Sequence, residues 1–241
     1  MANVVALINQ STIVSDAEIA SYCPALDAQL NDDFVPFWGY DCGASVIFAA
    51  KGMKVPDSAR QIIIVDHCNE PGALGFHIDA DGNPTSDIGA ADDLADGCKL
   101  SVTISHELLE MQCDPLCTRM VPVGADQFIV EVSDAVEADA DGYEKNGIWV
   151  SDFCTPKFFG LSTPSGCTPD PRYDFRGLLT APCPAMLPGG YLAKLANNQW
   201  TDLTARLANG SRSYRSQRSG RTAYRIKAAW GKSLSLYKLE R

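Results

Sequence analysis

Residues 101–115 are the segment that most constrains the fold, because their apolar and polar side chains repeat with the period of a helix. His106, Glu110 and Asp114 are spaced four residues apart, so a helix places all three on one face. Apolar side chains occupy the other side of the same helix: Ile104, Leu108, Leu109 and Met111. The helix is expected to end by Asp114, because Pro115 disfavours helical geometry in the residue before it. The sequence therefore predicts a buried helix with one polar edge, as a site inside a cleft requires.

Glu107 follows His106 directly and is rotated from it by about 100° around the helix axis. This is the position of the general base in a zinc peptidase, which lies close to the metal ion without binding it. The alternative is an ordinary helix with a partly buried, hydrogen-bonded His106. Three neighbouring features favour the metal site: a β segment with a turn at 73–84, two acids downstream (Glu131 and Asp134), and the proline that closes the helix.

Four blocks of sequence form a recurring set: Ala-Leu-Gly-Phe-His (73–77), Ser-His-Glu-Leu-Leu-Glu-Met-x-x-Asp-Pro (105–115), Glu-Val-Ser-Asp-Ala-Val-Glu (131–137) and Val-Ser-Asp-Phe-Cys-Thr-Pro (150–156). Together with Pro-Gly-Gly-Tyr (188–191) before an Arg- and Ser-rich end, they resemble zincin-like proteins encoded by tailed bacteriophages and prophages. The resemblance covers about residues 70–241. It implies an α+β, zincin-like domain with a mixed sheet and an active-site-type helix, in which residues 73–84 contribute the edge strand on the substrate side.

One position departs from the zincin pattern, which reads His-Glu-x-x-His, because Glu110 replaces the second histidine. Zinc also accepts carboxylate oxygen, so His106 and Glu110 stay expected ligands. Glu131 or Asp134 is the best placed third ligand in chain order. One nitrogen and two carboxylates form an anionic site that could prefer another divalent ion or hold zinc with less Lewis acidity. We therefore expect a divalent metal ion, zinc first, with Glu107 as the catalytic residue of an active site.

The chain has only three histidines, and a three-histidine site would need all of them. His67 follows the strand 61–66 and, with Asp66, could line the same cleft. It is more often an ordinary hydrogen-bonded side chain at a strand end, and the same expectation holds for His77 on the edge strand. Asp152 is expected to be a turn residue. Cys113 and Cys117 lie four residues apart, but no second pair follows them, which gives little support to a structural zinc site.

Residues 1–154 are expected to form the zincin-like domain, and 155–241 a β-rich, proline-rich extension with a basic tail. Residues 155–190 contain seven prolines and five glycines, which predicts irregular, wrapping structure. A helix is expected after Ser15, where Ser15 and Glu18 form a capping-box pattern. Strands or hairpins are expected at 4–8, 37–50, 61–66, 73–79, 127–132, 143–153 (around Asn146-Gly147) and 191–203 (around Asn197-Asn198).

The first residues lack the basic and long apolar regions of a secretory signal, and no apolar stretch reaches the about 18 residues of a membrane span. The sequence therefore predicts a protein made in the host cytoplasm, carried in the virion if phage-encoded, with no membrane contact. Its nine cysteines are expected to be mostly reduced and buried.

The charge is distributed unevenly along the chain. From Arg206 onward there are ten basic residues and one acidic residue, whereas the preceding part has ten basic and twenty-nine acidic residues. A basic tail on an acidic body predicts contacts with other virion proteins or with copies of the same chain. Nucleic acid is a weaker alternative, suggested by arginines interleaved with Tyr214 and Tyr224. The leading hypothesis is a virion-associated structural protein with altered catalysis, and the alternative is an active metal-dependent peptidase.

Overall fold

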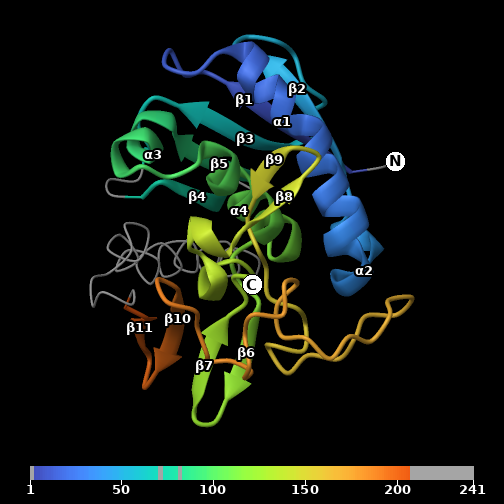
Figure 1. Cartoon of the computed structure of the whole chain (residues 1–241), viewed down its shortest axis with the longest axis vertical. Helices are drawn as coiled ribbons and strands as arrows, with labels where there is room; N and C mark the ends of the chain where they lie inside the picture. Colours follow the sequence, from blue (N-terminus) through green and yellow to red (C-terminus); the bar gives the residue numbers. More distant parts are fainter. Residues whose placement is uncertain (1–2, 70–72, 81–82, 207–241) are drawn as a thin grey trace, which may run out of the picture.

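A mixed five-stranded sheet forms the upper part of this computed structural model, which describes residues 3–69, 73–80 and 83–206 (Figure 1). Its strands run in the order β2-β1-β3-β5-β4. Neighbouring strands are parallel except at the edge, where β4 runs antiparallel to β5. The strands are β1 (Val4–Asn9), β2 (Ser45–Ala50), β3 (Arg60–Val65), β4 (Gly75–Ala80) and β5 (Asn83–Gly89). The α+β class and the mixed sheet are therefore as predicted.

Helix α1 (Asp16–Ala28) connects the parallel strands β1 and β2 and packs against both (Figure 1). Parallel neighbours need such a crossover, because a tight turn cannot return the chain in the same direction. The predicted cap is present: the Glu18 amide donates to the Ser15 hydroxyl over 3.1 Å. The burial of β1, where residues 5–9 are all buried, explains its uninterrupted apolar sequence.

The chain after α1 stays helical, contrary to the strand or hairpin predicted from residue 37. It passes through the π-helix η1 (Gln29–Phe34), α2 (Val35–Trp38) and the 3₁₀ turn η2 (Tyr40–Cys42) before β2 begins. Aromatic residues there suggested a strand, but Phe34 and Trp38 are spaced by one helical turn. Their rings stack with centroids 5.9 Å apart, so the helical backbone brings the two aromatic side chains into contact.

Two helices follow the sheet: α3 (Ala90–Asp96) and α4 (Leu100–Cys113). Helix α4 ends at Cys113, one residue before Asp114, as Pro115 predicted. It packs against β4 and β5 and against the hairpin of β8 (Tyr143–Lys145) and β9 (Ile148–Val150). The sequence did not predict β5 as a strand or α3 as a helix.

A second, antiparallel sheet lies in the lower part of Figure 1, with the order β11-β10-β7-β6. Its strands are β6 (Met120–Val123), β7 (Asp126–Ile129), β10 (Tyr191–Ala196) and β11 (Gln199–Thr204). β7 is shorter than the strand predicted for 127–132, because the chain then turns toward α4 through the 3₁₀ helix η3 (Asp134–Val136); a further 3₁₀ turn, η4 (Asp139–Asp141), follows. Since β7 pairs with β10, the sheet joins segments from both sides of residue 154.

Residues 155–190 contain no helix or named strand, as predicted from their prolines and glycines. The segment is nevertheless part of the core, because Phe158 is fully buried and the Phe158 carbonyl accepts a hydrogen bond from the Cys183 amide. All nine cysteines are free thiols, and five of them are buried. No helix in the described part of the chain could cross a membrane. The predicted basic-tail contacts concern residues 207–241, which lie outside the described residues.

Candidate metal centre

Helix α4 is buried along its whole length, and a hydrogen-bond network fixes its rotation. The Ser105 hydroxyl donates to Oε1 of Gln29 over 2.7 Å and accepts from the Ser151 amide over 3.0 Å. Gln29 lies in η1, and its Nε2 donates to the carbonyl oxygen of Ser151 over 2.8 Å. Because Ser105 directly precedes His106, the network also fixes the direction in which the His106 side chain leaves the helix.

His106, Glu110 and Asp134 form the first of three buried groups that could hold a metal ion, hereafter the first group. His106 Nε2 lies 3.2 Å from Glu110 Oε1 and 3.2 Å from Asp134 Oδ1. Glu110 is one helical turn beyond His106, whereas Asp134 begins η3. The Ser133 amide donates to Glu110 Oε1 over 3.1 Å, which ties η3 to α4. The three ligand residues are 4%, 4% and 1% exposed.

His77, Glu107 and Glu110 form the second group. His77 lies on the edge strand β4, and its Nδ1 is 3.4 Å from Glu107 Oε2 and 4.0 Å from Glu110 Oε2. Its Nε2 is 3.2 Å from the carbonyl oxygen of Asp114, which can only accept. A neutral imidazole with its hydrogen on Nε2 satisfies this contact and directs its Nδ1 lone pair at the two carboxylates, whereas an imidazolium donates from both nitrogens, to Glu107 and to Asp114. Burial by itself lowers the pKa of His77, but its neighbours, Cys117 and Glu131 first, hold that pKa well above its ordinary value.

His77, Cys117 and Glu131 form the third group, with one ligand atom of each residue within 4.8 Å of the others. The Cys117 thiol donates to the His77 carbonyl over 3.6 Å. Glu131 is 5% exposed, and its Oε2 has no hydrogen-bond partner within the described residues. Of the two acids predicted as the third ligand of His106, the structure therefore groups Asp134 with His106 and Glu131 with His77.

Burial and mutual charge shift the pKa values of these side chains strongly. Burial by itself lowers the pKa of His106, but Glu110 and Asp134 outweigh it and hold that pKa well above its ordinary value. Burial and then Glu110 raise the pKa of Asp134 to about 7. Burial likewise raises the pKa of Glu131 well above its ordinary value, and Glu110 adds to the rise. The cluster therefore needs protons or cations to balance its carboxylates.

The donor atoms of the first group fit a divalent metal ion. Within the described residues, no Lys or Arg forms an ion pair with Glu107, Glu110, Glu131 or Asp134. Two ligands of a tetrahedral zinc ion, each about 2.1 Å from it, are about 3.4 Å apart. The 3.2 Å separations around His106 Nε2 are close to this value. One N–H cannot point at both carboxylates, whereas one cation can bind all three donors.

Asp114 does not join the polar edge of the helix, so the prediction that it points the same way as His106 and Glu110 is wrong. It has left the helical conformation, with φ −135°, because Pro115 ends the helix before it. Its carboxylate accepts hydrogen bonds from the amides of Thr118 and Arg119 over 3.1 and 2.6 Å. Asp114 thus stabilises the turn after α4 and contributes its backbone carbonyl to His77.

The remaining sequence candidates lie outside the three groups. The His67 side chain is 75% exposed and contacts Asp92, as expected of an ordinary histidine at a strand end. Asp152 is fully buried and accepts a hydrogen bond from the Phe153 amide, so it is not an exposed turn residue.

His77 is the residue that sequence reasoning set aside and the structure brings into the cluster. Its signal is the alternation of side chains along an edge strand, since Gly75 and His77 lie on the same face of β4. A Cβ atom at Gly75 would meet Glu107 and Thr103 of α4, which shows that this face lies against the helix. His77 is near Glu107 because β4 packs against α4, and this tertiary contact could not be predicted from the sequence.

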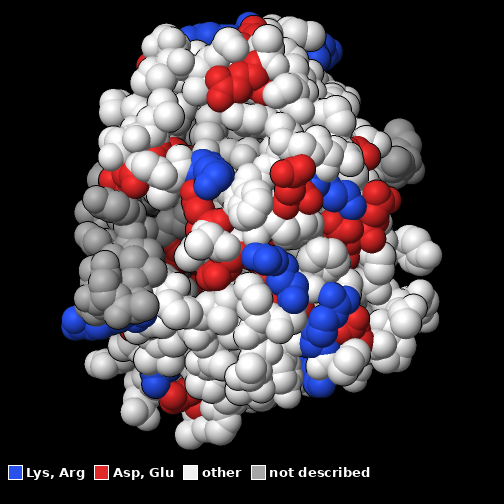
Figure 2. Space-filling model, in the orientation of Figure 1, with Lys and Arg blue, Asp and Glu red and all other residues white. Residues whose placement is uncertain are grey.

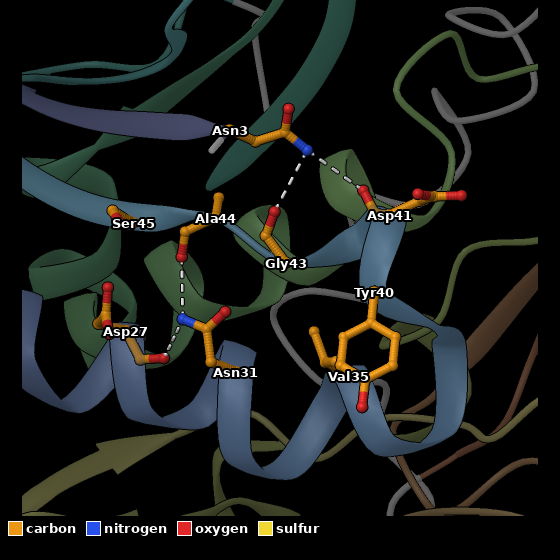
Figure 3. A pocket seen from close by; sticks show the side chains of 9 residues that line it. All are labelled: Asn3, Asp27, Asn31, Val35, Tyr40, Asp41, Gly43, Ala44 and Ser45. Carbon is orange, nitrogen blue, oxygen red and sulfur yellow. Dashed lines mark hydrogen bonds between the residues drawn. The ribbon is translucent and has the colours of Figure 1, made fainter. Parts of the chain in front are cut away.

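A surface pocket of about 620 Å³ lies near β2, at the opposite edge of the five-stranded sheet from β4 (Figure 3). The side-chain amides of its two asparagines donate to backbone carbonyls of the pocket. Asn3 Nδ2 donates to the carbonyls of Asp41 and Gly43, and Asn31 Nδ2 donates to those of Asp27 and Ala44. These amides are therefore already satisfied within the protein.

The buried cluster unites an edge strand, a central helix and a 3₁₀ turn around two histidines and four carboxylates. No family model, curated protein or solved structure matches the chain, and no relative therefore assigns a role to any of these side chains.

Proposed function

We propose that the protein binds a divalent metal ion within a zincin-like scaffold and serves as a structural component of a tailed-phage particle. The observation that supports metal binding is the convergence of His106, Glu110 and Asp134 in a buried space without a basic partner among the described residues. The phage context rests on the four sequence blocks that resemble zincin-like phage proteins.

The enclosure of the first group supports a structural role for the ion. A catalytic metal ion must keep a position open for water and substrate, and ligands that are buried from solvent restrict that access. His106, Glu110 and Asp134 are at most 4% exposed. An ion held by all three would cross-link α4 to η3, adding to the hydrogen bond from Ser133. The Glu107 carboxylate, which was expected to act as the general base, lies 3.4 Å from His77 Nδ1. This contact joins α4 to β4 and so gives Glu107 a structural role.

The position of β4 supports the zincin-like scaffold. The resemblance predicted that residues 73–84 provide an edge strand upstream of the helix that carries His106. β4 is at the edge of the sheet, antiparallel to its neighbour, and packs against α4. The edge position of β4 and its packing against α4 therefore support this part of the proposal.

Elemental analysis of the purified full chain tests metal binding. We expect at least one equivalent of a divalent ion in the wild type and its loss in Glu110→Gln, because this residue joins both the first and the second group. Asp152→Asn is the matched control, since it changes a buried carboxyl outside the three groups. Absence of metal from the wild-type protein after incubation with zinc and dialysis would contradict the proposal.

Copy number in purified particles tests the structural role. A structural component should be present at a fixed stoichiometry that matches a symmetry of the particle. Quantitative mass spectrometry of particles purified from the phage or prophage that encodes the chain measures this number. A protein absent from the particles, while abundant in the lysate, would contradict the virion assignment and leave metal binding untouched.

Peptide hydrolysis is the second candidate function, favoured by the position of Glu107 beside the edge strand β4. An extended peptide could add to the free side of such a strand through its backbone. A divalent ion would supply Lewis acidity there, and Glu107 would accept the proton of the attacking water. Glu107→Gln should abolish hydrolysis of unfolded casein and retain metal in the first group. Hydrolysis that persists in this variant would exclude the mechanism.

Contacts through the basic tail stay a prediction, because residues 207–241 lie outside the described residues. Figure 2 shows that Lys and Arg on one face are interspersed with Asp and Glu rather than gathered in a continuous basic patch among the coloured residues. This distribution gives nucleic acid no evident surface on the face shown, so we propose protein partners for the tail in preference to nucleic acid.

A further inference from the structure

We propose that the buried cluster holds two divalent cations, bridged by the carboxylate of Glu110. His106 and Asp134 complete the first cation position, and His77 and Glu107 complete the second. The inference rests on the proposed metal binding at the first group and adds a second ion, which a purely mononuclear site would lack.

The two oxygens of Glu110 serve different histidines. Its Oε1 lies 3.2 Å from His106 Nε2, whereas its Oε2 lies 4.0 Å from His77 Nδ1. The Ser133 amide donates to Oε1 and so fixes the orientation of the carboxylate. Two-metal sites in proteins hold their ions about 3.5–4 Å apart, a separation that one carboxylate can bridge. Glu110 is therefore oriented to bind one ion with each oxygen.

His77 has the surroundings of a metal-ligating histidine. Such histidines almost always donate their second N–H to a carbonyl or carboxylate, which fixes the tautomer and the ring orientation. His77 Nε2 makes this contact with the Asp114 carbonyl over 3.2 Å, and Nδ1 is left to bind an ion. Glu107 Oε2 is 3.4 Å from the same Nδ1. Once Nδ1 has lost its proton, a cation between its lone pair and the carboxylate oxygens of Glu107 and Glu110 would bind all three groups.

The charge of the cluster also suits two divalent ions. Glu107, Glu110, Glu131 and Asp134 are between 1% and 6% exposed, and no Lys or Arg in the described ranges forms an ion pair with them. Four buried carboxylates with neutral histidines keep two negative charges after one divalent ion binds, and none after two. Because an uncompensated buried charge is costly, a second ion would replace the protons that the metal-free carboxylates need.

Glu131 is a further buried carboxylate beside His77, in the third group. Its Oε2 is buried without a hydrogen-bond partner in the described part of the chain, and one of its oxygens lies within 4.8 Å of a ring nitrogen of His77. A polar atom in this state is rare in a folded protein unless water or an ion occupies the space beside it. A cation near His77 would give this oxygen a partner.

Metal titration of the full chain tests the second position. The protein is stripped with chelator, loaded with Zn²⁺ by equilibrium dialysis and analysed for bound metal per chain. We expect two equivalents in the wild type and one in both Asp134→Asn and Glu107→Gln, which remove a ligand from opposite positions. Asp152→Asn should keep two, because it lies outside the cluster.

Mn²⁺ loading tests the bridge without any variant. Two Mn²⁺ ions joined by Glu110 should couple magnetically, so the six-line electron paramagnetic resonance signal of isolated Mn²⁺ should be absent at full loading. If the wild type binds only one equivalent of metal, the second position is overturned and the proposed function stays intact. If the wild type binds no metal, both the second position and the proposed metal binding are overturned. Two uncoupled ions would overturn the bridge by Glu110.

Discussion

Gly75 of strand β4 lies so close to Glu107 of helix α4 that a Cβ atom on Gly75 would come within 3.0 Å of the Glu107 Cγ. The same atom would be 2.8 Å from Ile88 Cδ1 and 3.1 Å from Thr103 Cγ2. A glycine is therefore what permits the edge strand to approach the helix. His77 lies two residues further along this strand, so the approach also brings His77 to Glu107.

Gly75→Ala should destabilise the protein and weaken the second cation position. Overpacking of this kind costs about 1–3 kcal/mol, and relief by a shift of β4 would move His77 away from Glu107. Urea denaturation measures the first effect, and zinc equivalents per chain measure the second. Thr103→Ser removes one clashing methyl group but keeps the hydroxyl that donates to Asp93. The double variant Gly75→Ala/Thr103→Ser should therefore recover part of the stability that Gly75→Ala loses. An alanine variant as stable as the wild type would contradict this close packing.

Metal removal should lower the melting temperature. An ion present at 100 times its Kd stabilises the folded state by about 2.7 kcal/mol, which raises the Tm by about 5–10 °C for a domain of this size. Differential scanning fluorimetry with zinc, and then with excess chelator, measures the shift. Glu110→Gln should abolish the shift, whereas Asp152→Asn should keep it. A wild-type Tm that chelator does not change would show that metal binding contributes nothing to stability.

Local signals in the sequence predicted much of the fold correctly. Asn146 and Gly147 adopt the left-handed φ values of 50° and 81° that a tight hairpin between β8 and β9 needs. Ser15 caps α1 through the Glu18 amide, and Pro115 places the end of α4. Each of these signals acts within a few residues, so no knowledge of distant contacts was needed.

Long-range pairing explains what the sequence did not predict. Strand β5 contains Pro84 and Asp87, which are rare in strands, yet it pairs with β3 on one side and with β4 on the other. The residues of the metal groups also differ in whether local spacing or long-range packing brings them together. His106 and Glu110 follow from helical spacing, whereas Asp134 was one of two equal candidates and His77 was set aside. Only tertiary packing brings η3 and β4 to the two ends of the Glu110 carboxylate.

Ser105→Ala should destabilise the protein more than Ser101→Ala. Ser105 joins Gln29 to the Ser151 amide, so its removal leaves one buried acceptor and one buried donor without this partner, at about 1–3 kcal/mol each. Ser101 makes one hydrogen bond, to the Trp149 carbonyl over 2.7 Å. Equilibrium unfolding in urea compares two serine-to-alanine changes on the same buried helix. Equal losses in the two variants would show that the Ser105 network has no special role in fixing α4.

Asp152 and Asp174 form a buried carboxyl pair away from the metal groups, and both are fully buried. Burial raises the pKa of Asp152 well above its ordinary value, and the hydrogen-bonding contact with Asp174 raises it further. Asp152 Oδ1 accepts from the amides of Phe153 and Arg176, while Asp174 accepts from the amides of Leu178 and Leu179. The raised pKa favours the protonated form of Asp152, whose O–H can donate to Asp174.

This pair predicts a pH-dependent gain in stability for Asp152→Asn. The pKa of Asp152 is higher in the folded than in the unfolded chain, so its contribution to stability is fully present below about pH 3.9 and is lost as pH rises through the folded pKa. An asparagine amide can donate to Asp174 at every pH, and its oxygen can still accept from the Phe153 amide. The free energy of unfolding of the variant, relative to wild type, should therefore rise above pH 3.9 by up to about 1.4 kcal/mol per pH unit. Urea titrations from pH 4 to pH 8 measure this difference, and a difference independent of pH would show that Asp152 is ionised in the folded protein.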